Sequence, residues 1–177
     1  MSNHQQISKF LSLILRHQPH LIGVELDANG WIDVQLLLEK CQRQFPQLDR
    51  ELLEHIVATN EKKRFAFNEE GDKIRASQGH SVQVDLQLEP MTPPEILYHG
   101  TVEKSLSQIR KNGLKGMSRM HVHLSKDQET ARIVGNRRGE PIILEVQAGR
   151  MYKDGFLFYC SANGVWLCEQ VPPQYIQ

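Results

Sequence analysis

A proline-rich stretch at residues 85–94 constrains the fold more than any other feature, because the sequence pattern changes across it. Pro90, Pro93 and Pro94 lie within it, and such clusters are typical of linkers. On its N-terminal side apolar residues recur at helical spacing, whereas short strand-like runs dominate on its C-terminal side. The pattern predicts an α+β protein with two lobes, residues 1–89 and residues 90–177.

Composition limits the class of protein. Of the 177 residues, 40% are hydrophobic and 24% are charged, as in ordinary globular proteins. No apolar run approaches the roughly 20 residues of a membrane helix, and the N-terminus lacks signal-peptide features. The three cysteines, Cys41, Cys160 and Cys168, cannot all pair with one another. We therefore expect a cytoplasmic protein with no membrane partner.

The charge balance argues against a protein that simply coats nucleic acid. The chain has 21 basic and 21 acidic residues, whereas such proteins are usually basic. Any binding of RNA or phosphate must therefore come from local clusters of side chains.

The first lobe shows helices followed by a hairpin. Residues 3–17 carry apolar side chains at i, i+3, i+4 and i+7 from Ile7, which predicts an amphipathic helix. Asp33 and Asp49 are suited to cap two further helices. Residues 24–32 are expected to form a small hairpin or extended pair around an Asn-Gly turn, and residues 65–76 are expected to form a further hairpin. This order of elements resembles a winged helix, a nucleic-acid-binding architecture.

The second lobe is expected to be rich in strands. An apolar strand from Ile96 should run into a polar turn at residues 99–101, followed by a helix over residues 103–112 that Gly113 closes. Residues 141–146 predict a buried strand, and residues 156–168 predict a late hairpin around a second Asn-Gly turn.

The stretch at residues 117–125 combines several polar features. In a strand, His121 and His123 would share one face, opposite Val122 and Leu124. Ser125 is then expected to cap a following helix, with a capping box at the third residue after it. Because helix N-termini favour anions, we expect a phosphate-bearing ligand here.

Two other interpretations of the histidines stay open. His99, His121 and His123 could form a zinc site, although the other usual ligands do not cluster, so no metal is expected. They could also be ordinary polar histidines on an edge strand.

Three arginines stand beside distinctive local sequences. Arg16, Arg64 and Arg119 lie on separate predicted elements, and each taken alone is most simply a solvated surface residue. The guanidinium fork matches pairs of phosphate oxygens and keeps its charge. If the three converged, they would hold a phosphate dianion and stabilise charge that develops at phosphorus.

Six short motifs follow one another along nearly the whole chain, at residues 15–17, 62–65, 75–81, 98–101, 118–125 and 163–167. Together and in this order they resemble the RNA 2′-phosphotransferase family of the KptA type, whose eukaryotic members act in tRNA splicing. The resemblance implies an N-terminal winged-helix-like lobe for RNA and a C-terminal, β-rich lobe of the ADP-ribosyltransferase fold for NAD.

The resemblance also implies a reaction. An internal RNA 2′-phosphate is transferred to NAD+, a co-substrate, through an RNA-2′-phospho-ADP-ribose intermediate. The products are 2′-hydroxyl RNA, nicotinamide and ADP-ribose 1″,2″-cyclic phosphate. The expected partners are therefore NAD+ and a tRNA-like RNA with an internal 2′-phosphate, and no obligate protein partner is inferred.

The site residues are carried over from the same resemblance. The catalytic set is Arg16, His17, Arg64 and Arg119. The expected NAD-binding residues are His99, Gly100, Thr101, His123, Leu124, Ser125 and Val165. Val165 stands where many protein-modifying ADP-ribosyltransferases have a glutamate, which agrees with an acceptor that is already a charged nucleophile. The expected RNA-binding residues are Lys63, Arg75, Gln78, Gly79, His80 and Ser81.

Two other functions remain as alternatives. An ADP-ribosyltransferase that caps terminal phosphates of RNA or DNA would share both NAD and the arginines. A non-enzymatic winged-helix regulator is disfavoured by the balanced charge and by the histidine-containing motifs.

Overall fold

The computed structural model describes residues 3–177, which form two compact units. Unit 1 runs to Gln87, and unit 2 comprises Leu88–Gln177. The division lies two residues before the boundary expected from the sequence. Helices and small antiparallel sheets occur in the same chain, so the α+β class is confirmed. Within residues 3–177, no helix has both the length and the apolar character needed to cross a bilayer.

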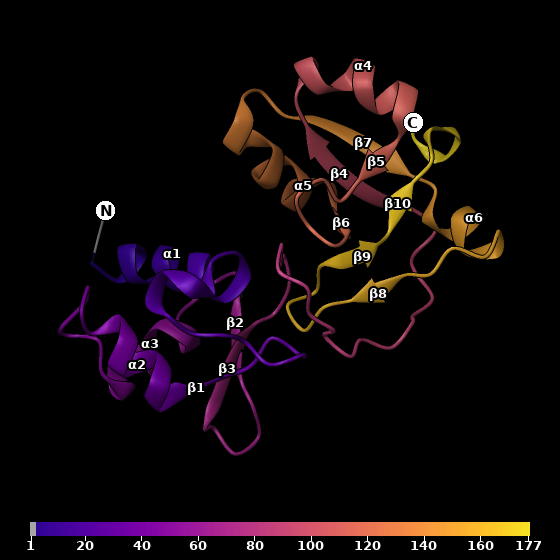
Figure 1. Cartoon of the computed structure of the whole chain (residues 1–177). Coiled ribbons are helices and arrows are strands. Elements are labelled where there is room, and N and C mark those ends of the chain that lie inside the picture. The colour runs from indigo at the N-terminus through magenta and orange to yellow at the C-terminus, as the bar shows by residue number, and fades with distance from the viewer. Residues whose placement is uncertain (1–2) are drawn as a thin grey trace. The chain divides into compact units, whose positions relative to one another are not determined.

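The described part of unit 1, residues 3–87, contains three α-helices, one 3₁₀ helix and one small sheet (Figure 1). Its strands are antiparallel and lie in the order β1-β3-β2. In chain order the elements are α1 (Asn3–Arg16), the 3₁₀ helix η1 (Pro19–Ile22), β1 (Ile32–Asp33), α2 (Val34–Cys41), α3 (Arg50–Ala58), β2 (Phe65–Phe67) and β3 (Lys73–Ala76).

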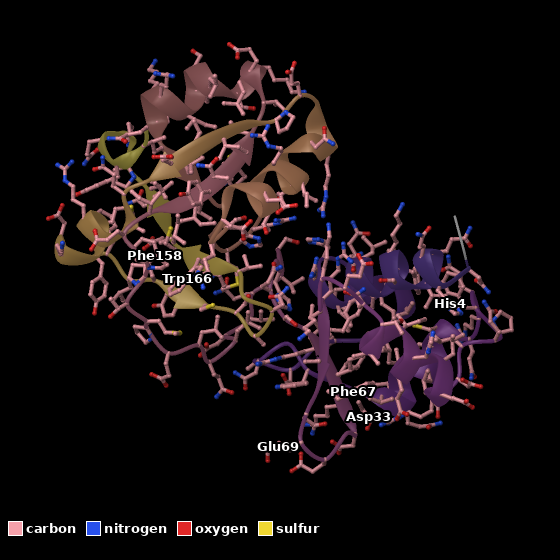
Figure 2. All side chains as sticks on the ribbon, turned by 180° about the vertical axis from the view of Figure 1, so that it is seen from behind. His4, Asp33, Phe67, Glu69, Phe158 and Trp166 are labelled. Atoms are coloured by element: carbon pink, nitrogen blue, oxygen red, sulfur yellow. The ribbon has the colours of Figure 1, made fainter. Side chains whose placement is uncertain are left out.

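Local sequence explains why these elements form. Ile7, Leu11 and Ile14 of the apolar stripe of α1 are fully buried in the core of unit 1. The Asp33 carboxylate accepts the Leu36 N–H at 2.8 Å, so the predicted cap of α2 is confirmed. Asp49 caps α3 in the same way. Glu69 lies at the tip of the β2–β3 hairpin, away from this core (Figure 2).

The small hairpin or extended pair predicted for residues 24–32 forms only around its turn, where the Asp27 N–H donates to the Trp31 carbonyl at 2.9 Å. The turn itself forms, because the Gly30 N–H donates to the Asp27 carbonyl at 3.0 Å and Gly30 has a φ of 82°. The segment before the turn is not a strand, however. Ile32 instead pairs with Ile74 of β3, because that pairing places both side chains in the core.

Unit 2 is built from short strands with helices between them (Figure 1). Three antiparallel arrangements occur: β4 with β7, β5 with β10, and β6-β9-β8. In chain order the elements are β4 (Leu97–Thr101), α4 (Glu103–Asn112), β5 (Leu114–Lys115), β6 (Val122–Leu124), α5 (Gln128–Gly135), η2 (Asn136–Arg138), β7 (Ile142–Val146), α6 (Ala148–Lys153), β8 (Tyr159–Cys160), β9 (Trp166–Cys168), β10 (Gln170–Val171) and η3 (Pro173–Tyr175).

The core of unit 2 is formed where the strands meet. Phe158 is fully buried and Trp166 is 8% exposed, and Figure 2 shows both rings in this core. The late hairpin is confirmed, since Cys160 of β8 pairs with Trp166 of β9. Ser125, just after β6, makes an antiparallel bridge to Tyr98 of β4. The ends of β4 and β6 are therefore fastened together.

Two expectations for unit 2 are corrected. Ser125 does not cap a helix, because it is held in the bridge to β4; the cap of α5 is Asp127, whose carboxylate accepts the Thr130 N–H at 2.7 Å. Residues 99–101 are not a turn, because β4 continues through Thr101 in register with β7. The short elements α6, β5 and β10 carried no clear sequence signal.

Candidate functional site

Arg16 is the last residue of α1, and its side chain is largely buried, with 9% exposed. Its carbonyl accepts the backbone N–H of Ser81 at 2.9 Å and that of Val82 at 3.3 Å. The last carbonyls of a helix have no partner within the helix, so this loop satisfies one of them. The end of α1 is thereby fastened to the loop that follows β3.

His17 is held by the same loop. Its N–H donates to the Leu13 carbonyl at 3.0 Å, which extends the helical pattern by one residue. Its ring Nδ1 lies 2.9 Å from the Ser81 hydroxyl. Gly79, with a φ of 88°, provides the backbone conformation that brings the loop back to the helix. The position of the imidazole is therefore set by a partner far away in the sequence.

Arg64 immediately precedes β2, and its backbone is held on both sides. The Arg64 N–H donates to the Asn60 side-chain oxygen at 3.1 Å, and its carbonyl accepts the Ser77 N–H at 2.8 Å. The Ser77 hydroxyl also donates to the Lys63 carbonyl at 2.9 Å. Lys63 adopts a φ of 41°, which turns the chain before the strand begins.

Unit 1 brings Arg16 and Arg64 to the same pocket, which has a volume of about 710 Å³. His17, Lys63 and Ser81 are not among the residues that line it. The lining residues are His4, Gln5, Ser8, Lys9, Ser12, Arg16, Ile56, Thr59, Asn60, Glu61, Lys62 and Arg64.

Several of these lining residues were not identified from the sequence. The available signal was a polar stripe along α1, with Gln5, Lys9, Ser12 and Arg16 at intervals of three or four residues. Residues at such spacing share one helix face. The polar stripe lies beside the apolar stripe that is buried in the core, and its side chains line the pocket.

His80 is enclosed in unit 1, with only 2% of its surface exposed. Within the described part of the chain, neither ring nitrogen has a hydrogen-bond partner. Burial, followed by the positive charges of Arg16, Arg75 and His17, lowers the pKa of His80 to about 4. The imidazole is therefore neutral at physiological pH.

The remaining residues expected to bind RNA differ in exposure. Lys63 and Ser81 are exposed, Gln78 is half-buried and Gly79 is buried. The Arg75 guanidinium lies 4.4 Å from the centre of the Trp31 ring, and it donates to the Asn29 carbonyl at 3.2 Å. RNA contact by these residues stays a prediction.

Unit 2 connects Arg119, His123 and His99 through hydrogen bonds. Arg119 Nη1 lies 3.2 Å from His123 Nδ1, and His99 Nδ1 lies 3.0 Å from the His123 carbonyl. Because a guanidinium only donates, His123 Nδ1 must accept, so that ring is neutral and carries its proton on Nε2. Because a carbonyl only accepts, His99 must carry a proton on Nδ1.

The other residues expected to bind NAD lie at the neighbouring strand ends. Gly100 packs against α5 so closely that an added Cβ would lie 1.9 Å from the Ala131 carbonyl oxygen. The side chains of Thr101 and Leu124 are buried. Val165 precedes β9, and its backbone bonds in both directions to Ser161. The close contact between Gly100 and α5 shows that Gly100 has a packing role.

The three-histidine arrangement is not seen among residues 3–177, where no three His, Cys, Asp or Glu side chains gather as a metal site would require. His121 instead packs against Tyr159, with ring centres 6.0 Å apart and the ring planes inclined at 60°. Its pKa is lowered by burial, against the opposing effect of Glu169.

Comparison with known proteins gives a consistent result. The model of the RNA 2′-phosphotransferase, Tpt1/KptA family matches residues 2–170. A "Probable RNA 2′-phosphotransferase" of Flavobacterium johnsoniae is 60% identical, over 98% of this chain and 95% of that protein. Proteins with the same description from Trichormus variabilis and Fusobacterium nucleatum are 58% identical (97% of this chain, 94% of that protein) and 49% identical (100% and 99%). The chain therefore belongs to the Tpt1/KptA family of RNA 2′-phosphotransferases.

Proposed function

We propose that the protein removes an internal 2′-phosphate from RNA by transferring it to NAD+. The observation that carries the proposal is the pocket of unit 1, where Arg16 and Arg64 line one cavity. Two guanidiniums at one cavity suit a phosphate dianion, because each can donate a pair of hydrogen bonds to phosphate oxygens. Membership of the family supports RNA as the phosphate donor.

In the first step, an oxygen of the RNA 2′-phosphate bonds to the anomeric carbon of the nicotinamide ribose. The bond from that carbon to nicotinamide breaks, and its electron pair leaves on the ring nitrogen. NAD+ supplies the electrophilic carbon and a neutral leaving group. Arg16 and Arg64 orient the phosphate, so positioning contributes more here than an acid would.

In the second step, the 2-hydroxyl of the same ribose attacks phosphorus, and the bond to the RNA 2′-oxygen breaks. The hydroxyl proton is transferred to that oxygen, which yields 2′-hydroxyl RNA and the cyclic phosphate. We assign this proton transfer to His17. We assign to Arg119 the stabilisation of the negative charge that develops on the phosphoryl oxygens.

The histidines of unit 2 offer hydrogen-bonding groups for the NAD+ that the proposal assigns to this unit. The neutral His123 offers an Nε2–H donor, fixed by the bond from Arg119 to its other nitrogen. His99 is oriented by its bond to the His123 carbonyl. We therefore propose that unit 2 is the ADP-ribosyltransferase-like NAD lobe, and that unit 1, with three helices and a β1-β3-β2 sheet, is the winged-helix-like RNA lobe.

The test is an incubation with NAD+ and a short RNA that carries one radiolabelled internal 2′-phosphate. We expect the label in ADP-ribose 1″,2″-cyclic phosphate, with release of one nicotinamide per phosphate. A stable ADP-ribose cap on a terminal phosphate would instead support the capping alternative. Label that remains on the RNA in the presence of NAD+ would contradict the proposal.

A further inference from the structure

The pocket of unit 1 is far larger than the 2′-phosphate requires. Its volume is about 710 Å³, whereas one water takes up about 30 Å³ in the liquid and a phosphate group is only a few times larger. Arg16 ends α1, while Gln5, Lys9 and Ser12 lie on earlier turns of the same helix. Much of the cavity therefore extends along α1, beyond the groups that would hold the reacting phosphate.

The charge of the lining indicates the kind of ligand. Four cationic side chains line the pocket, against a single carboxylate from Glu61. Lys9 and Lys62 come from different elements, α1 and the segment that joins α3 to β2, and both are exposed to solvent. Two cations placed apart in this way suit a polyanion with spaced charges better than one small anion.

The other lining groups indicate which part of a nucleic acid would bind. Ser8 and Ser12 contribute hydroxyls and Asn60 contributes an amide, whereas the Thr59 hydroxyl donates to the His55 carbonyl at 2.7 Å. Such groups bond to phosphate and sugar oxygens without distinguishing bases. The described residues of the lining include no Phe, Tyr or Trp ring on which a base would stack.

We propose that this pocket holds the sugar–phosphate backbone of the RNA next to the 2′-phosphate, with Lys9 and Lys62 paired to flanking phosphodiesters. This inference rests on the proposed function and adds a second part to the same site. The flanking RNA is then recognised through the charge of its phosphodiesters and not through its bases. The enzyme therefore acts on internal 2′-phosphates in many sequence contexts.

The first test compares the double variant Lys9→Ala/Lys62→Ala with the wild type on an RNA octamer that carries one internal 2′-phosphate. We expect the RNA KM to rise roughly five- to tenfold for each lysine, with kcat and the KM for NAD+ within about twofold of wild type. The salt dependence of log kcat/KM should also become shallower by about 0.7 for each lysine–phosphate pair that the substitutions remove. Lys73→Ala is the matched control, because Lys73 is exposed in unit 1 outside the pocket.

A second variant separates charge recognition from a purely structural effect. Glu61→Gln removes the carboxylate of the lining, so the RNA KM should fall by roughly twofold. A structural defect would not improve binding. An unchanged or higher RNA KM in this variant would count against the inference.

Chemical substitution in the RNA identifies the partner of the lysines. Replacing the flanking phosphodiesters with uncharged methylphosphonates should raise the wild-type KM, and the double variant should then show no further increase. The inference is overturned if the double substitution raises the RNA KM as much on the methylphosphonate octamer as on the natural one. It is also overturned if the KM for NAD+ rises instead of the RNA KM. If the wild type forms no cyclic phosphate from either octamer, the proposed function itself has failed.

Discussion

The imidazole Nδ1 of His17 lies 2.9 Å from the hydroxyl of Ser81, a residue 64 positions further along the chain. The Ser81 N–H also donates to the carbonyl of Arg16, at 2.9 Å. One residue of the loop therefore holds two neighbouring members of the proposed catalytic set. The geometry of the end of α1 depends on this loop as much as on the helix.

Ser81→Ala should lower kcat for cyclic phosphate formation by about fivefold, because a hydrogen bond of about 1 kcal/mol that orients His17 is lost. His17→Ala should cost far more, of the order of a hundredfold, because the proton-transfer group itself is removed. Single-turnover assays would measure both variants. Ser81→Thr retains a hydroxyl and should recover most of the activity; a Thr variant as slow as the Ala variant would count against the orienting role.

Arg119→Ala should stall the reaction between its two steps. The guanidinium is assigned to charge on the phosphoryl oxygens, and removing one such donor typically slows the step it serves by about a hundred- to a thousandfold. RNA bearing phospho-ADP-ribose should then accumulate on a denaturing gel. Arg110→Ala, on the exposed surface of α4, serves as the control and should behave like wild type. Wild-type turnover by Arg119→Ala would end this assignment.

Gly100→Ala should destabilise the protein, because the added Cβ would lie 1.9 Å from the Ala131 carbonyl oxygen of α5. Overpacking against backbone typically costs about 1–3 kcal/mol, and this contact belongs at the upper end of that range. Gly164→Ala is the control, because its Cβ would enter open space and only the φ of 78° opposes it. Denaturant unfolding should give a clearly larger loss for Gly100→Ala. Equal losses would contradict the packing role.

His80 should make the free energy of unfolding depend on pH. Its pKa is about 4 in the folded protein and near 6.5 in the unfolded chain, so only the unfolded chain takes up the proton as pH falls below 6.5. Stability contributed by the neutral ring is fully present above pH 6.5 and is lost, by about 3 kcal/mol in all, as pH falls to about 4.

Urea unfolding at several pH values would measure this dependence. His80→Gln removes the titrating group, so its curve should be flatter than that of wild type between pH 4 and pH 6.5, whatever the variant loses in absolute stability. The control His20→Gln alters an exposed histidine and should leave the wild-type slope in place. Parallel curves for His80→Gln and wild type would show that His80 does not carry the effect.

The sequence predicts strongly patterned elements well. The caps at Asp33 and Asp49 and the apolar stripe of α1 follow from interactions within a few residues, and all are present in the structure. The late hairpin forms as predicted, because its Asn-Gly turn and flanking apolar residues agree with one another. Elements whose local sequence signals all favour the same structure keep that structure in the folded protein.

The failed predictions depend on distant partners. Ser125 has the local pattern of a cap, but its backbone pairs with Tyr98 of β4, and the cap passes to Asp127. Ile32 pairs with Ile74 rather than within a local hairpin. The sequence also does not predict the burial of His80 or the hydrogen bond between His17 and Ser81. Periodicity reports only local structure, whereas these contacts join residues that are far apart in the sequence of unit 1.

NMR of the arginine Nε–H groups would show whether Arg16 and Arg64 hold the RNA 2′-phosphate, on which the proposed mechanism depends. A dinucleotide with an internal 2′-phosphate would be titrated into the labelled protein beside its 2′-hydroxyl counterpart, with signals assigned from Arg→Lys variants. We predict that the Arg16 and Arg64 signals shift with the phosphorylated dinucleotide alone. Shifts confined to arginines outside the pocket, such as Arg43 or Arg110, would contradict this mechanism.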